Sequence, residues 1–244
     1  MQTAKWGGPG WCFLHGIPMC YPEELTVKQA DEIIEFLELL KDILPCKYCR
    51  ASYADFLVEL PPREFIEQPP AGYRPRSRLA LSRWLHEIHN KVNDKLEKPR
   101  DQDFLKSCCR LAGMGKLDAQ TVRRQWCNAL WDFLFTVAWN YIREPWRETA
   151  LRRLFELLPR VLAGCPAGKQ LQECLSKTPL SEQALESLDN MKQWIYQLRS
   201  GCAAACGEPS SFEEIDVLYE SWRSGTCNER DPLKKKSKRS LERC

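Results

Sequence analysis

Apolar residues recur at the period of an α-helix along most of this 244-residue chain. The clearest stretch runs from Leu81 to Leu96, where apolar side chains at helical spacing predict one amphipathic helix that ends before Pro99. Glycines and a proline between Trp6 and Trp11 predict a turn-rich segment, with the first helix starting near Trp11. No segment alternates apolar and polar residues over more than a few positions, and no internal repeat is evident. The sequence therefore predicts an all-α fold.

A pair of cysteines follows another apolar helical stretch. Thr26 and Gln29 have the spacing of a capping box, and the apolar residues that follow keep helical spacing. Pro45 interrupts this pattern and restarts a helix, so that Cys46 and Cys49 lie in a first helical turn. The positive end of a helix dipole favours the thiolate, which is the form that exchanges with disulfides. This setting is typical of a redox-active disulfide.

The same two cysteines have a second interpretation. Cys46 and Cys49 have the spacing of half a zinc site, and His86 and His89 lie at i and i+3 on a later predicted helix. These four residues would make a zinc-stabilised interaction module without catalysis. The cysteine spacing alone leaves both interpretations open.

Composition and charge limit the classes of function. Thirteen cysteines are many for a reducing compartment, where cysteine use indicates metal binding or redox catalysis. No run approaches the roughly 18 apolar residues of a membrane span, and the first six residues lack the core of a signal peptide. We therefore expect a cytosolic protein with no membrane partner. The net charge is +3, and the basic C-terminal tail accounts for the excess, so the nearly neutral body argues against a nucleic-acid partner.

The sequence changes character after residues 105–118, a glycine-containing and less periodic stretch that is followed by a heavily aromatic helical pattern from Trp126 to Phe135. This break indicates two domains. We expect a first domain over residues 1–108, a second helical domain over residues 109–230, and a basic disordered tail over residues 231–244. Within the second domain, helices are predicted at about 181–199 and 212–223.

Three motifs, taken in order, resemble those of the Erv/ALR family of FAD-dependent sulfhydryl oxidases. They are the opening Trp6-Gly7-x-x-x-Trp11-x-x-Leu14-His15, the central Pro45-Cys46-x-x-Cys49-Arg50 preceded by Tyr21-Pro22, and the helix His89-Asn90-x-Val92-Asn93-x-x-Leu96-x-Lys98-Pro99. The resemblance covers about residues 5 to 100. Gly8, Ser52 and Glu97 depart from the proline, histidine and glycine that the family commonly has at these positions.

This resemblance implies an FAD-binding helical bundle that acts as a thiol oxidase. Such an enzyme forms disulfides in proteins and passes electrons to oxygen, giving hydrogen peroxide. Cys49 would be the thiol beside the flavin and Cys46 the thiol that exchanges with substrate. The cofactor would contact aromatic, imidazole, amide and ammonium side chains, namely Trp11, His15, Tyr21, Trp84, His89, Asn90, Asn93, Lys95 and Lys98; the two lysines suit a pyrophosphate. A flavin-binding scaffold without catalysis is the remaining alternative.

Oxidases of this type usually need a second, mobile cysteine pair that passes electrons to the first. Cys202 and Cys206 are the candidates for this shuttle, because the small residues around them allow movement and exposure. An inert structural pair is the alternative. Cys165 and Cys174 are a candidate structural disulfide, and the other cysteines cannot be paired from the sequence.

The aromatic second region resembles, more weakly, the extra helical domain of sulfhydryl oxidases from large cytoplasmic DNA viruses. This likeness implies a viral enzyme that works in the host cytoplasm, at viral assembly sites or in the virion, against a reducing environment. The expected partners are thiol-containing proteins, molecular oxygen and a second copy of the chain.

Overall fold

The computed structural model describes residues 2–102, 104, 119–203, 207 and 209–224. Within these residues every regular element is a helix, apart from an isolated bridge between Glu24 and Ser77. The predicted all-α class is confirmed. The predicted domain boundary after residue 108 and the basic tail from residue 231 lie outside the described residues. None of the described helices combines the length and hydropathy needed to cross a membrane.

The first half of the chain follows the helical periodicity of its sequence. Its described helices are α1 (Thr3–Gly16), the 3-10 helix η1 (Ile17–Cys20), α2 (Val27–Ile43), α3 (Lys47–Glu59), α4 (Pro62–Glu67) and α5 (Arg78–Lys95). The predicted capping box forms at the start of α2: the Gln29 amide donates to Thr26 Oγ1 at 3.2 Å, and the Thr26 amide donates to Gln29 Oε1 at 2.9 Å. The long helix predicted from Leu81 is α5.

Helix α1 departs from the sequence prediction. It begins at Thr3 and continues through the glycines and Pro9, so the predicted turn-rich segment before Trp11 is wrong. Tertiary packing explains the difference, because α1 lies against α5 and α7 and buries Trp6 and Phe13. This burial outweighs the poor helix propensity of the glycines.

The second half of the chain adds a further set of helices. They are α7 (Ala119–Trp139), α8 (Pro145–Val161), α9 (Pro166–Lys177), α10 (Glu182–Leu185), α11 (Leu188–Gly201) and α13 (Phe212–Ser224). The helix predicted over 181–199 is divided, because Ser187 has an extended backbone and caps α11 by accepting from the Asn190 amide at 3.1 Å. Helix α13 matches the pattern predicted over 212–223.

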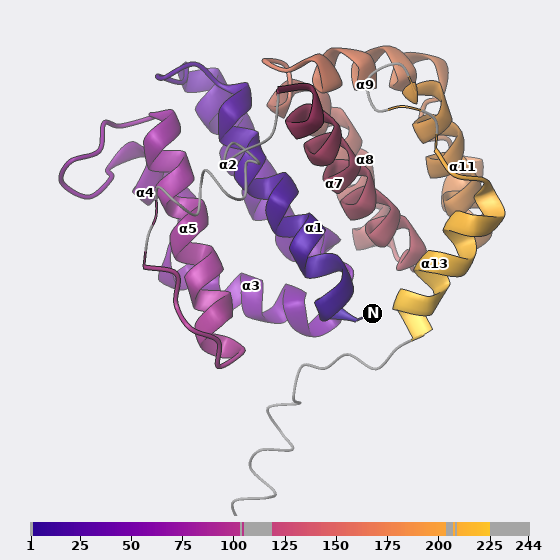
Figure 1. Cartoon of the computed structure of the whole chain (residues 1–244), viewed down its shortest axis with the longest axis horizontal. Coiled ribbons are helices and arrows are strands. Elements are labelled where there is room, and N and C mark those ends of the chain that lie inside the picture. Colours follow the sequence, from indigo (N-terminus) through magenta and orange to yellow (C-terminus); the bar gives the residue numbers. More distant parts are fainter. Residues whose placement is uncertain (1, 103, 105–118, 204–206, 208, 225–244) are drawn as a thin grey trace, which may run out of the picture.

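The two halves pack through their first two helices. Helix α7 lies along α1, and α8 lies along α2, so that these four helices occupy the centre of the molecule (Figure 1). Trp126 of α7 packs on Gly16, and its indole N–H donates to the Phe13 carbonyl at 3.0 Å. Phe13 also stacks on Phe133, with ring centroids 5.3 Å apart. The core is therefore continuous between the halves.

The second half repeats the helix order of the first. Helices α1 to α5 run long, long, medium, short and long, and α7 to α11 follow the same order. Corresponding helices also pack alike, since α2 contacts α3 as α8 contacts α9, and α4 contacts α5 as α10 contacts α11. The sequence shows no repeat because this architecture depends on apolar spacing, which many different side chains satisfy.

Candidate active site

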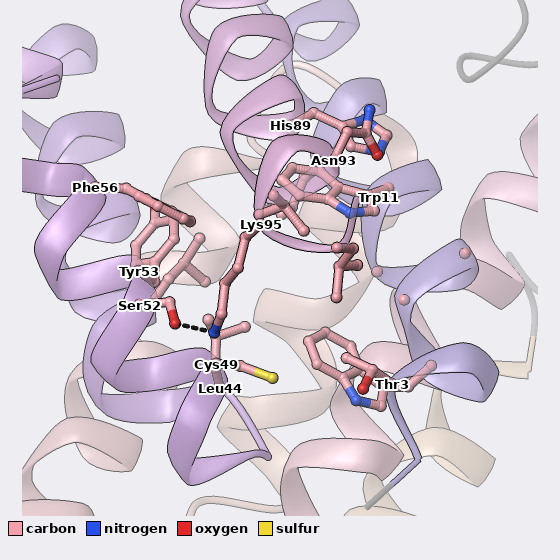
Figure 2. Close-up of a pocket in the computed structure, with 18 of the residues that line it drawn as sticks. Thr3, Trp11, Leu44, Cys49, Ser52, Tyr53, Phe56, His89, Asn93 and Lys95 are labelled. Atoms are coloured by element: carbon pink, nitrogen blue, oxygen red, sulfur yellow. Dashed lines mark hydrogen bonds between the residues drawn. The ribbon is translucent and has the colours of Figure 1, made fainter. Parts of the chain in front are cut away.

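A cavity of about 530 Å³ lies beside the second cysteine of the Cys-x-x-Cys pair. Its wall is built by α1, α3 and α5, with single residues from α2 and α7. Figure 2 shows the side chains of these helices converging on one space, with Trp11 and His89 at one side and Cys49 at another. The helices of the first half thus position most of the lining, and α7 of the second half completes it through Phe133.

The two thiols have unequal positions. Cys46 is the N-cap of α3, and its Sγ accepts the Cys49 amide at 3.4 Å. Cys49 lines the cavity and points its sulfur into it, whereas Cys46 does not line it (Figure 2). The Arg50 guanidinium donates to the Leu44 carbonyl at 2.8 Å and holds the turn before Cys46. The start of α3 therefore directs the Cys49 thiol into the cavity and keeps the Cys46 thiol outside the lining.

An aromatic and imidazole cluster forms the opposite wall. Trp11 stacks on His89 with ring centroids 4.0 Å apart and an interplanar angle of 10°. His15 Nε2 lies 3.1 Å from His89 Nδ1, so one of these nitrogens donates and the other accepts. Burial, followed by the neighbouring His89 and His86, lowers the pKa of His15 to about 3. His15 is therefore neutral at physiological pH, and it fixes the ring plane that His89 offers to the cavity.

Two lysines place positive charge at the end of α5. Lys95 and Lys98 both line the cavity, and Lys95 Nζ donates to Ser52 Oγ on α3 (Figure 2). Asn93 also lines the cavity, and its amide nitrogen donates to Asn90 Oδ1 at 3.3 Å. The arrangement can receive an anionic group between α3 and the end of α5.

The end of α5 depends on a residue with a left-handed backbone. Glu97 has φ +57°, the Lys98 amide donates to the Asn93 carbonyl at 2.9 Å, and the Glu97 amide donates to the Asp94 carbonyl at 3.1 Å. These are the two hydrogen bonds of a Schellman motif, in which glycine is usual at the left-handed position. This geometry explains why glycine is common in the family at the position where this chain has Glu97.

Besides His15, which lies behind His89, three of the nine residues predicted to contact the cofactor lie outside the cavity lining. Trp84 is fully buried and donates its indole N–H to the Leu60 carbonyl at 3.1 Å. Asn90 binds the backbone of Asp101, accepting its amide at 2.8 Å and donating to its carbonyl at 3.0 Å. Tyr21 is buried near Cys20 rather than near Cys49. These residues support the surrounding helices, so their predicted cofactor contact does not fit the cavity.

Of the other six predicted contacts, five line the cavity: Trp11, His89, Asn93, Lys95 and Lys98. His15 lies directly behind His89. Sequence reasoning missed Trp6, Tyr53 and Phe56 as lining residues, although Trp6 belongs to the opening motif. The buried Trp6 indole nitrogen has no hydrogen-bond partner among the described residues. It can therefore donate to a ligand, as a buried donor must to avoid a desolvation cost.

The structure does not bring the four candidate zinc ligands together. His89 lies in the stack with Trp11, whereas His86 packs against Phe104, with ring centroids 5.3 Å apart. Across the described residues, no three His, Cys, Asp or Glu side chains lie where they could hold a metal ion. The zinc module is therefore wrong as an interpretation of Cys46, Cys49, His86 and His89.

The remaining cysteines are arranged differently from the prediction. Cys165 is the N-cap of α9 and Cys174 lies near its other end, at opposite ends of a rigid helix, so the predicted pair between them is wrong. Cys165 is instead hydrogen-bonded to Cys20, and Cys174 to Cys202. Cys202 is only 2% exposed, which contradicts the exposure expected of a shuttle thiol. Cys206 lies outside the described residues, so the shuttle itself stays a prediction.

Comparison with known proteins matches this arrangement of cysteines and aromatic residues to one family. The family model described as Erv1 / Alr matches residues 9–126, which include the Cys-x-x-Cys pair, the His89 helix and the start of α7. Residues 9–126 belong to the Erv1/Alr family. The match continues past the predicted boundary at residue 108, into the helix that packs on α1.

Curated proteins are similar to this chain over the same stretch. The chain is 35% identical over 94 residues to the mitochondrial FAD-linked sulfhydryl oxidase ERV1 of Saccharomyces cerevisiae, covering 38% of this chain and 44% of that protein. It is 32% identical over 93 residues to the probable FAD-linked sulfhydryl oxidase R368 of Acanthamoeba polyphaga mimivirus, covering 38% and 59%. The matched region spans about half the length of these relatives. No solved structure matches the chain significantly.

Proposed function

We propose that this protein is an FAD-dependent thiol oxidase that forms disulfides in protein substrates. The observation that carries the proposal is the position of Cys49, which points from a Cys-x-x-Cys turn into a cavity walled by the Trp11 and His89 stack. Relatives over this same stretch are named FAD-linked sulfhydryl oxidases. The fold, the site and the family therefore support one activity.

The cavity fits a flavin dinucleotide in size and chemistry. Its volume lies in the range of ordinary cofactor pockets, and its lining is largely aromatic and apolar. The Trp6 indole N–H is a buried donor with no partner in the described part of the chain. Lys95 and Lys98 would hold the pyrophosphate, while Trp11 and His89 would pack on a ring. FAD, when bound, supplies an acceptor for the electron pair that two thiols release on forming a disulfide.

The residues of the chain then have separate tasks. Cys46 exchanges with an incoming dithiol, and Cys49 faces the cavity where the electrons leave. The Cys49 amide, which donates to Cys46 Sγ at 3.4 Å, stabilises negative charge on that sulfur when it is the leaving thiolate. His15 holds the plane of His89 without adding charge.

The remaining features of the activity follow from the family and the viral likeness. The electron acceptor is molecular oxygen, which gives hydrogen peroxide, and the substrates are thiol-containing proteins. We place the enzyme in the cytoplasm of an infected host, at virus assembly sites or in the virion. It acts as a homodimer, and Cys202 with Cys206 passes electrons to Cys46.

Replacement of the two cysteines tests the activity. Cys49→Ser should lower thiol-dependent oxygen consumption by roughly a thousandfold or more, because the thiol facing the cofactor is lost. The yellow flavin absorption of the purified variant should persist, since the rest of the lining is unchanged. Cys165→Ser, which removes a thiol of the second half outside the cavity, should retain both activity and colour.

Two outcomes would contradict the proposal. Full oxygen consumption by Cys49→Ser would exclude Cys49 from the reaction. A yellow wild-type protein without thiol-dependent peroxide production would indicate the flavin-binding scaffold instead.

A further inference from the structure

Two thiols meet where the halves of the molecule join. Cys20 is the last residue of η1 in the Erv1/Alr domain, and Cys165 is the N-cap of α9 in the second half. Although they are far apart in sequence, their side chains are hydrogen-bonded to each other. Neither belongs to the cavity lining or to the Cys46 and Cys49 turn.

The backbone of Gly164 also lies against the backbone of Cys20. A Cβ added to Gly164 would lie 1.6 Å from the Cys20 carbonyl oxygen, so glycine is required there and the two chain segments touch. A disulfide needs Cα atoms about 4.4–6.8 Å apart, which only directly contacting segments provide. Gly164 immediately precedes Cys165, so this close approach brings the Cys165 backbone next to that of Cys20.

The thiols of Cys20 and Cys165 differ in exposure and in the direction of their pKa shifts. Cys165 is partly exposed, and its pKa is lowered by the hydrogen bond with Cys20 and by the Gly168 amide in the first turn of α9. Cys20 is buried, and its pKa is raised by the hydrogen bond with Cys165 and by burial. Because Cys165 is the more exposed of the two thiols, it is the one that attacks an external disulfide, and Cys20 is the thiol that follows.

We propose that Cys20 and Cys165 form a disulfide that covalently joins the Erv1/Alr domain to the second helical region. Cys165 thiolate attacks a disulfide R–S–S–R, forming a mixed disulfide and releasing one thiolate. Cys20 then attacks the Cys165 sulfur, forming the Cys20–Cys165 bond and releasing the second thiolate; the two cysteines lose two protons and two electrons, and R–S–S–R gains them as two thiols. In the cell the oxidant is the Cys46–Cys49 disulfide of another copy, a part that rests on the proposed function.

Peptide mapping tests the bond in the full-length protein. The protein is reduced, reoxidised with glutathione disulfide, blocked with N-ethylmaleimide and cleaved with trypsin. The peptide of residues 6–28 should be recovered joined to that of residues 161–169, with a mass two hydrogens below their sum once N-ethylmaleimide on Cys12 is counted. Fragment ions should place the bond on Cys20 and not on Cys12. The bond should also form in Cys49→Ser, because glutathione disulfide replaces the enzyme's own oxidant; a failure of the proposed activity therefore does not affect this result.

Two variants and a stability measurement complete the test. Cys165→Ser should abolish the joined peptide, and Gly164→Ala should reduce it severalfold, because the added methyl displaces the Cys20 backbone. Dithiothreitol should lower the melting temperature of the oxidised wild type by about 10 °C more than that of Cys165→Ser, because the disulfide of Cys127 is reduced in both proteins. Recovery of Cys20 and Cys165 as N-ethylmaleimide or glutathione adducts after oxidation, with no joined peptide, would overturn the inference.

Discussion

His15 shows how a single ring is set by its surroundings. It is 3% exposed and lies between the core and His89, with Nε2 and Nδ1 of the two rings 3.1 Å apart. Its pKa of about 3 lies below the value of an unfolded histidine, about 6.5. Between these two values the unfolded chain binds more protons than the folded one, so stability should rise with pH.

This linkage gives a pH dependence that can be measured. From pH 7 to pH 5 the His15 contribution should cost about 2 kcal/mol of unfolding free energy, by the shift from about 6.5 to about 3. His15→Gln removes the titration, so urea unfolding at the two pH values should give a loss smaller by about that amount. Equal losses in the variant and the wild type would show that His15 does not carry the effect.

Glu97 carries the backbone conformation that ends α5. A non-glycine residue at φ +57° is strained by about 1 kcal/mol. Glu97→Gly should therefore stabilise the protein by up to about 1 kcal/mol in urea unfolding, because the Schellman hydrogen bonds require this conformation. Asp94→Gly in the last turn of the same helix should destabilise it by a similar amount, since glycine there gains nothing. A loss of stability in Glu97→Gly would exclude strain at this position.

At the scale of the elements, long and strongly periodic helices could be predicted from the sequence. Helices α2 and α5 appear where apolar spacing and the capping box indicated them. The start of helix α1 could not be predicted, because its glycines have low helix propensity. The helix forms there because its face is buried against α5 and α7. The division between α10 and α11 was also missed, since it depends on one capping serine within a continuous apolar pattern.

Helix α1 contains a matched pair of glycines for testing this packing. A Cβ on Gly16 would lie 1.9 Å from the Trp126 indole nitrogen, whereas one on Gly8 would meet nothing within 4 Å. Gly16→Ala should therefore destabilise the protein by roughly 2 kcal/mol, because a packed ring must move. Gly8→Ala should raise stability by up to about 1 kcal/mol through helix propensity. Equal effects in calorimetry would contradict the packing of α7 on α1.

At the scale of the whole molecule, the site was only partly accessible to sequence reasoning. The Cys46 and Cys49 turn and the His89 helix could be found, because their residues lie close together in short motifs. Phe133 could not, because it reaches the cavity from α7, across an interface between halves that no local pattern encodes. Trp84 and Asn90 share helix α5 with lining residues, yet their side chains bind the backbone of Leu60 and Asp101 outside the cavity.

The Phe133 wall has a thermodynamic consequence. A molecule in the cavity contacts both halves at once. Part of its binding free energy therefore adds to the stability of the packing between α1 and α7. Only the docked arrangement has the complete wall, and mass action then favours docking more strongly as ligand concentration rises above its dissociation constant. Loss of ligand should therefore loosen the junction between the halves before either half unfolds, making cofactor supply a control on assembly of the chain.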